Sequence, residues 1–274
     1  MKSIKLIIVI SILNQSIIYG QIVSGLVTDE QDNPLPFVNI GVIDNNKGTI
    51  SSIGGEFQLN ITDIGDSQVL RISSVGYESA DFKIGVLRQQ FDQEDILKIS
   101  LKKKVYQIDE VMVETEKRKI FFIGSKKPGN TTWAWYNLLN GAEIGSLISN
   151  SDKIYLRDFY FHIGETNCDS ILYRLKIYTI SNEMPDSIVN NEEIFFMSEK
   201  QKGWECISLT DKRILISDDF IIALETINGW NKGGDKTIYL SKIQNKGLSY
   251  KRQSSMATWL KFTGEMSYKL EVSK

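Results

Sequence analysis

Histidine is almost absent from this 274-residue sequence, which contains only His162. A catalytic zinc site needs three protein ligands, and a serine-hydrolase triad needs a histidine base. The sequence has no His-Glu-x-x-His spacing and no Gly-x-Ser-x-Gly elbow, and its His-x-x-Glu spacing, from His162 to Glu165, has no second histidine to complete a zinc site. We therefore predict no metal site and no catalytic residue, and we interpret His162 as a structural residue of a strand.

A strong charge of either sign is also missing, because the formal net charge is −2 at pH 7. Such a chain has no broad field that attracts nucleic acid or an anionic membrane. No Walker loop or dinucleotide-binding glycine motif is present, so we expect no nucleic-acid partner and no cofactor. The adjacent acids Asp218 and Asp219 would face opposite sides of a strand, which makes a glycosidase pair a poor interpretation.

Long hydrophobic runs are missing except at the N-terminus. Lys2 and Lys5 flank the start of an apolar run that extends to Leu13, and the polar residues 14–16 interrupt it. This pattern is typical of a secretory signal, and it is too short for a membrane span of about 20 apolar residues. We expect residues 1–20 to be a cleaved signal peptide. The mature protein would have no transmembrane segment and would be periplasmic, associated with the outer membrane, or extracellular.

Cysteine is scarce as well, with Cys168 and Cys206 as the only two. Export would place both in an oxidising compartment, where one disulfide between them is conceivable. Sequence alone does not show whether the two residues come close enough to bridge. A disulfide and two buried thiols remain equal alternatives.

Helical periodicity is rare, and apolar and polar residues instead alternate with a period of two. Phe57, Leu59 and Ile61 alternate with polar residues, and residues 171–177 show the same pattern. Many short alternating runs separated by turn signals predict an all-β protein. A boundary is expected near Lys103. It would divide residues 21–103 from a strand and charged linker at 104–119 and a second β-rich unit at 120–274.

An ordered series of turn and strand residues marks the first unit. The series contains Gly25, Asp29, Pro34, Leu35, Pro36, Gly48, Thr49, Gly55, Phe57, Gly76 and Tyr77. In its order and spacing, the segment 21–103 resembles the carboxypeptidase regulatory-like family, a transthyretin-like β-sandwich. The resemblance implies structural roles for these residues. It implies no peptidase activity, because the domain is an accessory to such enzymes.

Two weaker resemblances concern the rest of the chain. Residues 108–113 are similar to a segment that follows this domain in TonB-dependent transporters, but residues 120–274 are too few for a barrel of about 22 strands. Residues 203–225 resemble strands of jelly-roll modules. The predicted fold is therefore a transthyretin-like sandwich followed by a jelly-roll-like sandwich.

Aromatic residues supply the remaining candidate for binding. Trp133 and Trp135 lie two positions apart and share one face of a predicted strand that also contains Tyr136. If the two tryptophans are exposed, they would form a stacking platform for a sugar or peptide. If they are buried, they belong to the core, and this is the favoured alternative.

Together these features predict a non-catalytic extracytoplasmic binding protein of a Gram-negative envelope. Its partner would be a cell-envelope protein or a polysaccharide. A purely structural envelope component is the alternative, and a glycan-directed hydrolase is the third hypothesis.

Overall fold

The computed structural model describes residues 21–90, 96–104, 118–136 and 141–274. Three β-sheets account for most of these residues, with one short helix, α1 (Ile84–Gln90), and one 3-10 turn, η1 (Thr210–Lys212). The all-β prediction is confirmed. Within the described ranges, no helix is long and apolar enough to cross a membrane. The predicted signal peptide and residues 108–113 lie outside the described residues.

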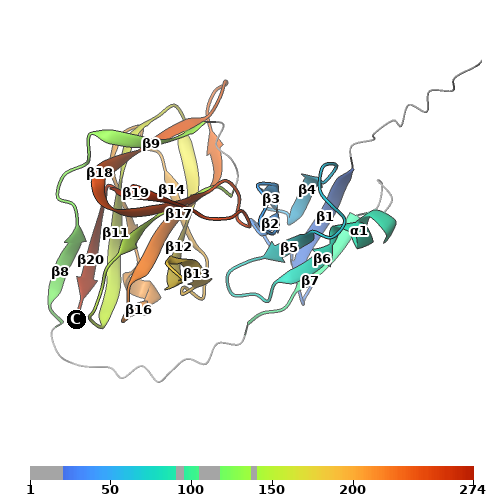
Figure 1. Cartoon of the computed structure of the whole chain (residues 1–274), viewed down its shortest axis with the longest axis horizontal. Helices are drawn as coiled ribbons and strands as arrows, with labels where there is room; N and C mark the ends of the chain where they lie inside the picture. Colours follow the sequence, from blue (N-terminus) through green and yellow to red (C-terminus); the bar gives the residue numbers. More distant parts are fainter. Residues whose placement is uncertain (1–20, 91–95, 105–117, 137–140) are drawn as a thin grey trace, which may run out of the picture.

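The first unit, residues 21–104, packs two small sheets against each other (Figure 1). In one sheet, β1 (Ile22–Asp29) lies between β4 (Glu56–Asn60) and β7 (Ile96–Leu101). The other has the order β3-β2-β5-β6, with bounds Gly48–Ile50, Asn39–Val42, Val69–Ser73 and Ala80–Lys83. Alternate residues of both sheets form one core, because every second side chain of a strand points inward.

Several motif residues have clear structural reasons. Asp29 ends β1, and its Oδ1 accepts hydrogen bonds from the backbone N–H groups of Gln31 and Asn33, both at 2.9 Å. These bonds hold the turn that leads to Pro34. Gly25 faces the ring of Phe57, where a Cβ atom would overlap the ring. The close approach of β1 to β4 therefore requires glycine at position 25.

The second unit, residues 118–274, is built from one 13-stranded sheet. Its strands are β8 (Ile120–Gly124), β9 (Thr131–Tyr136), β10 (Glu143–Ile148), β11 (Ile154–Thr166), β12 (Ser170–Ser181), β13 (Met184–Ile188), β14 (Ile194–Ser198), β15 (Gly203–Ser208), β16 (Leu215–Ile216), β17 (Phe220–Trp230), β18 (Thr237–Arg252), β19 (Leu260–Met266) and β20 (Tyr268–Ser273). The main path is β13-β12-β17-β10-β18-β11-β20-β8, and the other strands pair with β11, β12 or β18. Figure 1 shows these strands arranged around a common interior, which holds one large apolar core.

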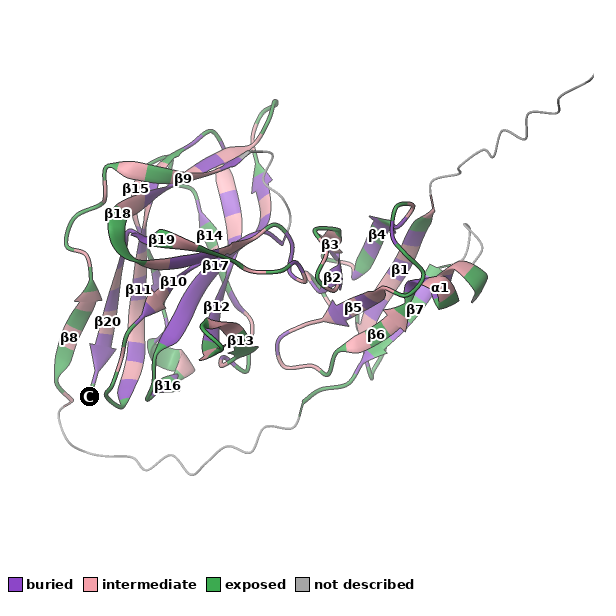
Figure 2. Ribbon diagram, viewed as in Figure 1, coloured by how far each residue is buried: buried purple, intermediate pink, exposed green. Residues whose placement is uncertain are grey.

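Strand β17 lies between β12 and β10 and is buried on both faces through residue 227 (Figure 2). Phe220, Ile222 and Leu224 point into the large core. On the opposite face, Ile221 and Ala223 form a smaller apolar cluster with Tyr178 and Tyr250. This second face carries the buried charges described next.

Candidate functional site at the junction of the two units

The two units meet where β2 and β3 of the first face the loop at residues 253–259 of the second (Figure 1). The backbone N–H of Asp44 donates a 3.0 Å hydrogen bond to the carbonyl of Met256. A Cβ atom at position 41 would lie 2.8 Å from Cγ of Met256, so Gly41 permits this close approach. Backbone contact of this kind indicates a fitted junction.

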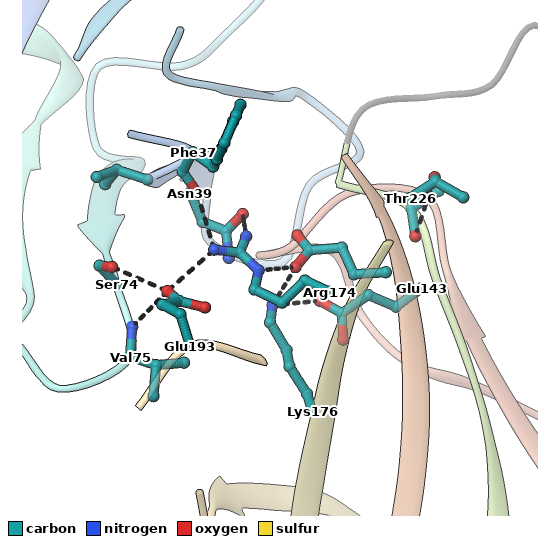
Figure 3. A network of polar contacts seen from close by, with 12 residues as sticks. Phe37, Asn39, Ser74, Val75, Glu143, Arg174, Lys176, Glu193 and Thr226 are labelled. Atoms are coloured by element: carbon teal, nitrogen blue, oxygen red, sulfur yellow. Dashed lines mark hydrogen bonds and ion pairs between the residues drawn. The ribbon is translucent and has the colours of Figure 1, made fainter. Parts of the chain in front are cut away.

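Arg174 of β12 is the central side chain of the junction, and it is completely buried (Figure 3). Its Nε donates to Oε2 of Glu225 at 2.6 Å within the second unit. Its Nη1 and Nη2 donate to the carbonyl of Phe37 at 2.8 Å and to Oδ1 of Asn39 at 2.7 Å in the first. One guanidinium therefore joins both units through its fixed fork of donors.

Glu193 makes a second link across the junction. Its Oε1 accepts from Nη1 of Arg174 at 3.1 Å, from the Ser74 hydroxyl at 3.0 Å and from the Val75 backbone N–H at 3.0 Å. Ser74 and Val75 belong to the segment that follows β5 of the first unit. The same oxygen thus pairs with the buried Arg174 and binds the loop of the first unit that contains Ser74 and Val75 (Figure 3).

The charges continue across four neighbouring strands of the second unit. The register places Glu225 of β17 between Arg174 and Glu143, and Arg252 of β18 beside Glu143. Lys176 reaches both acids, at 2.9 Å from Oε1 of Glu143 and 2.9 Å from Oε2 of Glu225. Arg252 Nη2 lies 2.6 Å from Oε1 of Glu143. When Glu193 is included, the cluster contains three basic and three acidic side chains, so its formal charges cancel.

The electrostatics keep this cluster ionised. Burial by itself would raise the pKa of Glu225, but the charges of Arg174 and Lys176 lower that pKa to about 2. Burial would also lower the pKa of Arg174, yet Glu225 and Glu193 raise it above its ordinary value. General acid–base catalysis needs a group that titrates near the working pH. Glu225 and Arg174 do not, so we interpret the cluster as a structural lock.

Beside this lock, a groove of about 990 Å³ opens between the units. The first unit contributes residues of β1, β3, β4 and β7, the turn at residues 51–53, and Phe37. The second unit contributes Ile227, Asn228 and Trp230 from the end of β17. Trp230 is 42% exposed and Ile53 is 80% exposed. The volume is in the range of ligand-binding clefts, which often lie between domains.

A β-bulge aims Trp230 at the groove. Arg174 pairs with Glu225, but Leu172 pairs with Asn228 and Ser170 with Trp230, so β17 contains one extra residue at this point. The extra residue switches which side chains of β17 point outward. Asn228 and Trp230 consequently lie on the same face as Glu225.

The aromatic residues that the sequence singled out lie elsewhere. Trp135 is 3% exposed and belongs to the large core. Trp133 is half-buried, with its ring 5.3 Å from Phe262 and with Lys242 Nζ 4.0 Å from the ring centre. Tyr136 belongs to β9, but its side chain lies outside the described residues. The structure therefore places Trp133 and Trp135 in interior packing, and the exposed tryptophan of the junction is Trp230.

The remaining candidates are isolated from the junction network. His162 is half-buried, with Nδ1 2.8 Å from the Ser241 hydroxyl, and burial and the charge of Lys202 lower its pKa. Both thiols are free; Cys168 is buried, but Cys206 is exposed, which differs from the expected alternative of two buried thiols. Among the residues that the structure describes, no cluster of His, Cys, Asp or Glu suits a metal ion.

Sequence reasoning missed the charges of the junction. Their signal was present in the alternating run of residues 171–177, where Arg174 and Lys176 occupy the outward positions of a long strand. Charged residues at outward positions of strands are usually solvated, so the pattern by itself does not indicate burial.

Comparison with known families identifies the first unit. Residues 23–113 match the CarboxypepD_reg-like domain, as the resemblance at residues 21–103 predicted, and the match extends ten residues further. No curated protein matches the chain.

Solved structures show only distant likeness. The cysteine protease and lectin-like domains of Cwp84, a surface-layer-associated protein of Clostridium difficile, are 13% identical, with a TM-score of 0.39 and coverage of 93% of this chain and 59% of that one. The VP2 subviral particle of infectious bursal disease virus is 12% identical, with a TM-score of 0.27 and coverage of 92% and 63%. Carbohydrate-binding modules of the β-sandwich superfamily are 11% identical, with a TM-score of 0.22 and coverage of 80% and 94%. The chain thus spans about six tenths of the first two, and these scores carry no argument about function.

Proposed function

We propose that this protein, whose residues 23–113 are a CarboxypepD_reg-like domain, is a non-catalytic interaction protein of a Gram-negative cell envelope. Its binding site is the groove at the junction of the two units. The observation that carries the proposal is the arrangement of an open groove of about 990 Å³ beside a buried ionic lock. The lock joins the two units that form the walls of the groove.

The proposal that the protein is not an enzyme is supported by the chemistry of the described residues. The buried carboxylates of Glu143 and Glu225 are paired with Lys176 and other cations, so they are not available to attack or to protonate a substrate. Glu56 is the acid that lines the groove, and its Oε2 accepts a 2.8 Å hydrogen bond from the Ser52 hydroxyl. A hydrolase that uses paired acids needs two carboxyl groups facing one substrate.

Export is the second part of the proposal. It is supported by Lys2 and Lys5 and by the short, interrupted apolar run before Gly20. We expect the mature protein to begin at or near Gln21. N-terminal sequencing of the protein from its native host checks this, and a retained Met1 in the membrane fraction would contradict it.

Binding is tested with purified residues 21–274. The protein is incubated with peptidoglycan sacculi, outer-membrane vesicles and secreted polysaccharide from the source bacterium, and sedimentation is measured over a range of concentrations. Saturable binding to one fraction is expected. Co-purification of a stable outer-membrane assembly without saturable binding to any fraction would favour a structural component instead.

The enzyme alternative is tested through His162. His162→Gln should cost about 1–2 kcal/mol of stability, because it changes the contacts of His162 with Ser241 and Trp204. Neither protein should hydrolyse esters, peptides or glycosides in a broad substrate screen. Turnover by the wild type that disappears in a variant with unchanged melting temperature would overturn the proposal, since loss of a catalytic base lowers rates by about 10²-fold or more.

A further inference from the structure

We infer that the junction groove binds an extended peptide segment that carries apolar side chains at alternate positions. This inference rests on the proposed function and names the class of partner for the same groove. It is argued from the register of the sheet, the exposed apolar side chains, the unpaired polar groups and the charges that line the groove.

The floor of the groove is the outer face of the β4-β1-β7 sheet. Ser24 of β1 lies between Gln58 of β4 and Ile96 of β7, and Leu26 lies between Glu56 and Lys98. Outward side chains repeat every second residue along a strand, at roughly 6.8 Å. An extended peptide that runs along this face has the same repeat, so its side chains match successive rows of the floor.

Exposed apolar side chains line both sides of the groove. Ile53 is 80% exposed, Ile96 is 60% exposed and Trp230 is 42% exposed, and the half-buried Leu26 also lines the groove. Contiguous apolar surface of this kind marks sites of protein–protein contact. Branched aliphatic side chains pack well against the side chains of a peptide. They offer little to a saccharide, which needs hydrogen bonds for its hydroxyl groups and flat aromatic rings for its faces.

Polar groups without partners complete the lining. The side chains of Ser24, Thr49 and Gln58 have no hydrogen-bond partner within the described ranges, and Nδ2 of Asn228 is likewise unused. Gln58 belongs to the first unit and Asn228 to the second. A carboxamide offers a donor and an acceptor, which suits the amide groups of a peptide backbone. Each unit therefore offers one carboxamide to the backbone of a peptide in the groove.

The charges of the groove do not favour a partner with a strong charge of one sign. Glu56 and Lys98 flank Leu26 on neighbouring strands, so the two signs balance along one row. A polyanionic chain would meet Glu56, and a polycationic chain would meet Lys98. A peptide that is apolar in its centre and mixed in charge at its ends is complementary to this row.

The ionic lock strengthens such binding. Because Arg174 and Glu193 tie the two units together, the wall that carries Trp230 does not have to be ordered when the peptide arrives. Preorganised sites lose less conformational entropy on binding, which improves affinity without added contacts.

The test uses residues 21–274 and a phage-displayed library of random dodecapeptides. Peptides enriched on the protein are synthesised with a fluorescent label, and their affinities are measured by fluorescence anisotropy. We expect enriched sequences with apolar residues at every second position. Trp230→Ala and Ile53→Asp should each weaken these peptides about tenfold or more, as changes at central interface residues do.

Matched controls come from a distant surface of the second unit. Phe122 is 61% exposed and Ile120 is 50% exposed on β8, so Phe122→Ala and Ile120→Asp remove the same kinds of group far from the groove. These two variants should bind the peptides as the wild type does. Thermal melts of all four variants check that each protein is folded.

Three results of the peptide and glycan experiments would overturn the inference. They are no enrichment of any sequence, enriched peptides that bind the groove variants and the wild type equally, and glycan-array binding that is lost in Trp230→Ala while no peptide binds. The last result would assign the groove to an oligosaccharide. Saturable binding to an envelope fraction that survives Trp230→Ala and Ile53→Asp would refute the groove and leave the wider proposal of an interaction protein standing.

Discussion

At the scale of single residues, the most consequential side chain is Arg174. It is fully buried, yet each of its three guanidinium nitrogens has an acceptor. Two of those acceptors are groups of the first unit, Phe37 and Asn39. Burying a charge costs several kcal/mol unless it is paired and hydrogen-bonded, so the arrangement is stable only while all members are present.

Removing this guanidinium should therefore be costly. Arg174→Met leaves Glu225 and Glu193 with fewer partners and leaves the carbonyl of Phe37 without this donor. We expect a loss of about 3–5 kcal/mol in the free energy of unfolding, measured by urea titration with tryptophan fluorescence.

The control for this change is a surface ion pair. Arg71 and Asp81 pair at 2.6 Å, but their side chains are 39% and 41% exposed. Arg71→Met should cost about 1 kcal/mol or less. Equal losses for the two variants would show that burial does not decide the strength of the Arg174 contacts.

The lowered pKa of Glu225 predicts how the stability of the fold depends on pH. Its pKa falls from an ordinary 4.5 to about 2 in the folded protein, so the unfolded chain holds more protons than the folded one between these values. The stability that Glu225 contributes is thus fully present above pH 4.5 and is lost as the pH falls toward 2. Urea titrations across this range give the free energy of unfolding at each pH. The slope of this free energy against pH should be smaller for Glu225→Gln than for the wild type, by the equivalent of about one proton. Identical slopes would contradict the assigned pairing.

At the scale of elements, the two neighbouring strands of β1 leave no room for a side chain at position 25. Its register pairs Gly25 with Phe57 of β4 and with Leu97 of β7. A Cβ atom at position 25 would lie 2.8 Å from the carbonyl oxygen of Leu97 and would overlap the Phe57 ring. The strand therefore tolerates no side chain at this position without moving a neighbour.

Gly25→Ala should destabilise the protein by about 1–3 kcal/mol, as overpacking of a core does. Gly65→Ala is the control, because its Cβ would meet only Oε1 of Gln68 at 3.9 Å. That change should stay within about 0.5 kcal/mol of the wild type. Thermal melts followed by circular dichroism compare the two, and a neutral Gly25→Ala would mean that β1 and β4 separate easily.

At the scale of the whole molecule, the first unit has a core of its own. Its apolar cluster is built only from residues of that unit, between Val23 and Leu101. The junction adds polar contacts and the pair of Phe37 with Phe195, whose ring centres lie 5.4 Å apart. The two units are therefore held together by a lock, and each has its own apolar interior.

A fragment of residues 21–103 should consequently fold alone with a β-type circular dichroism spectrum. It should melt at a lower temperature than the same unit in the full chain, because it lacks the donors of Arg174. Limited proteolysis of the full chain should cut first in the charged stretch 114–119, most of which lies outside the described residues. An unfolded fragment would refute the division into two units.

Sequence alone determined the all-β class and the regulatory-like domain, which it placed at residues 21–103. Alternation with a period of two and an ordered set of turn residues are local signals, and they survive in any tertiary context. Sequence did not reveal the junction, because Arg174 and Phe37 are 137 residues apart and their contact leaves no local pattern. It favoured Trp133 and Trp135 as core, and Trp135 does pack into the core, but it did not single out Trp230, which a bulge opposite Leu172 turns outward. Which face of a strand meets solvent, a core or a second unit was decided only when the sheets came together.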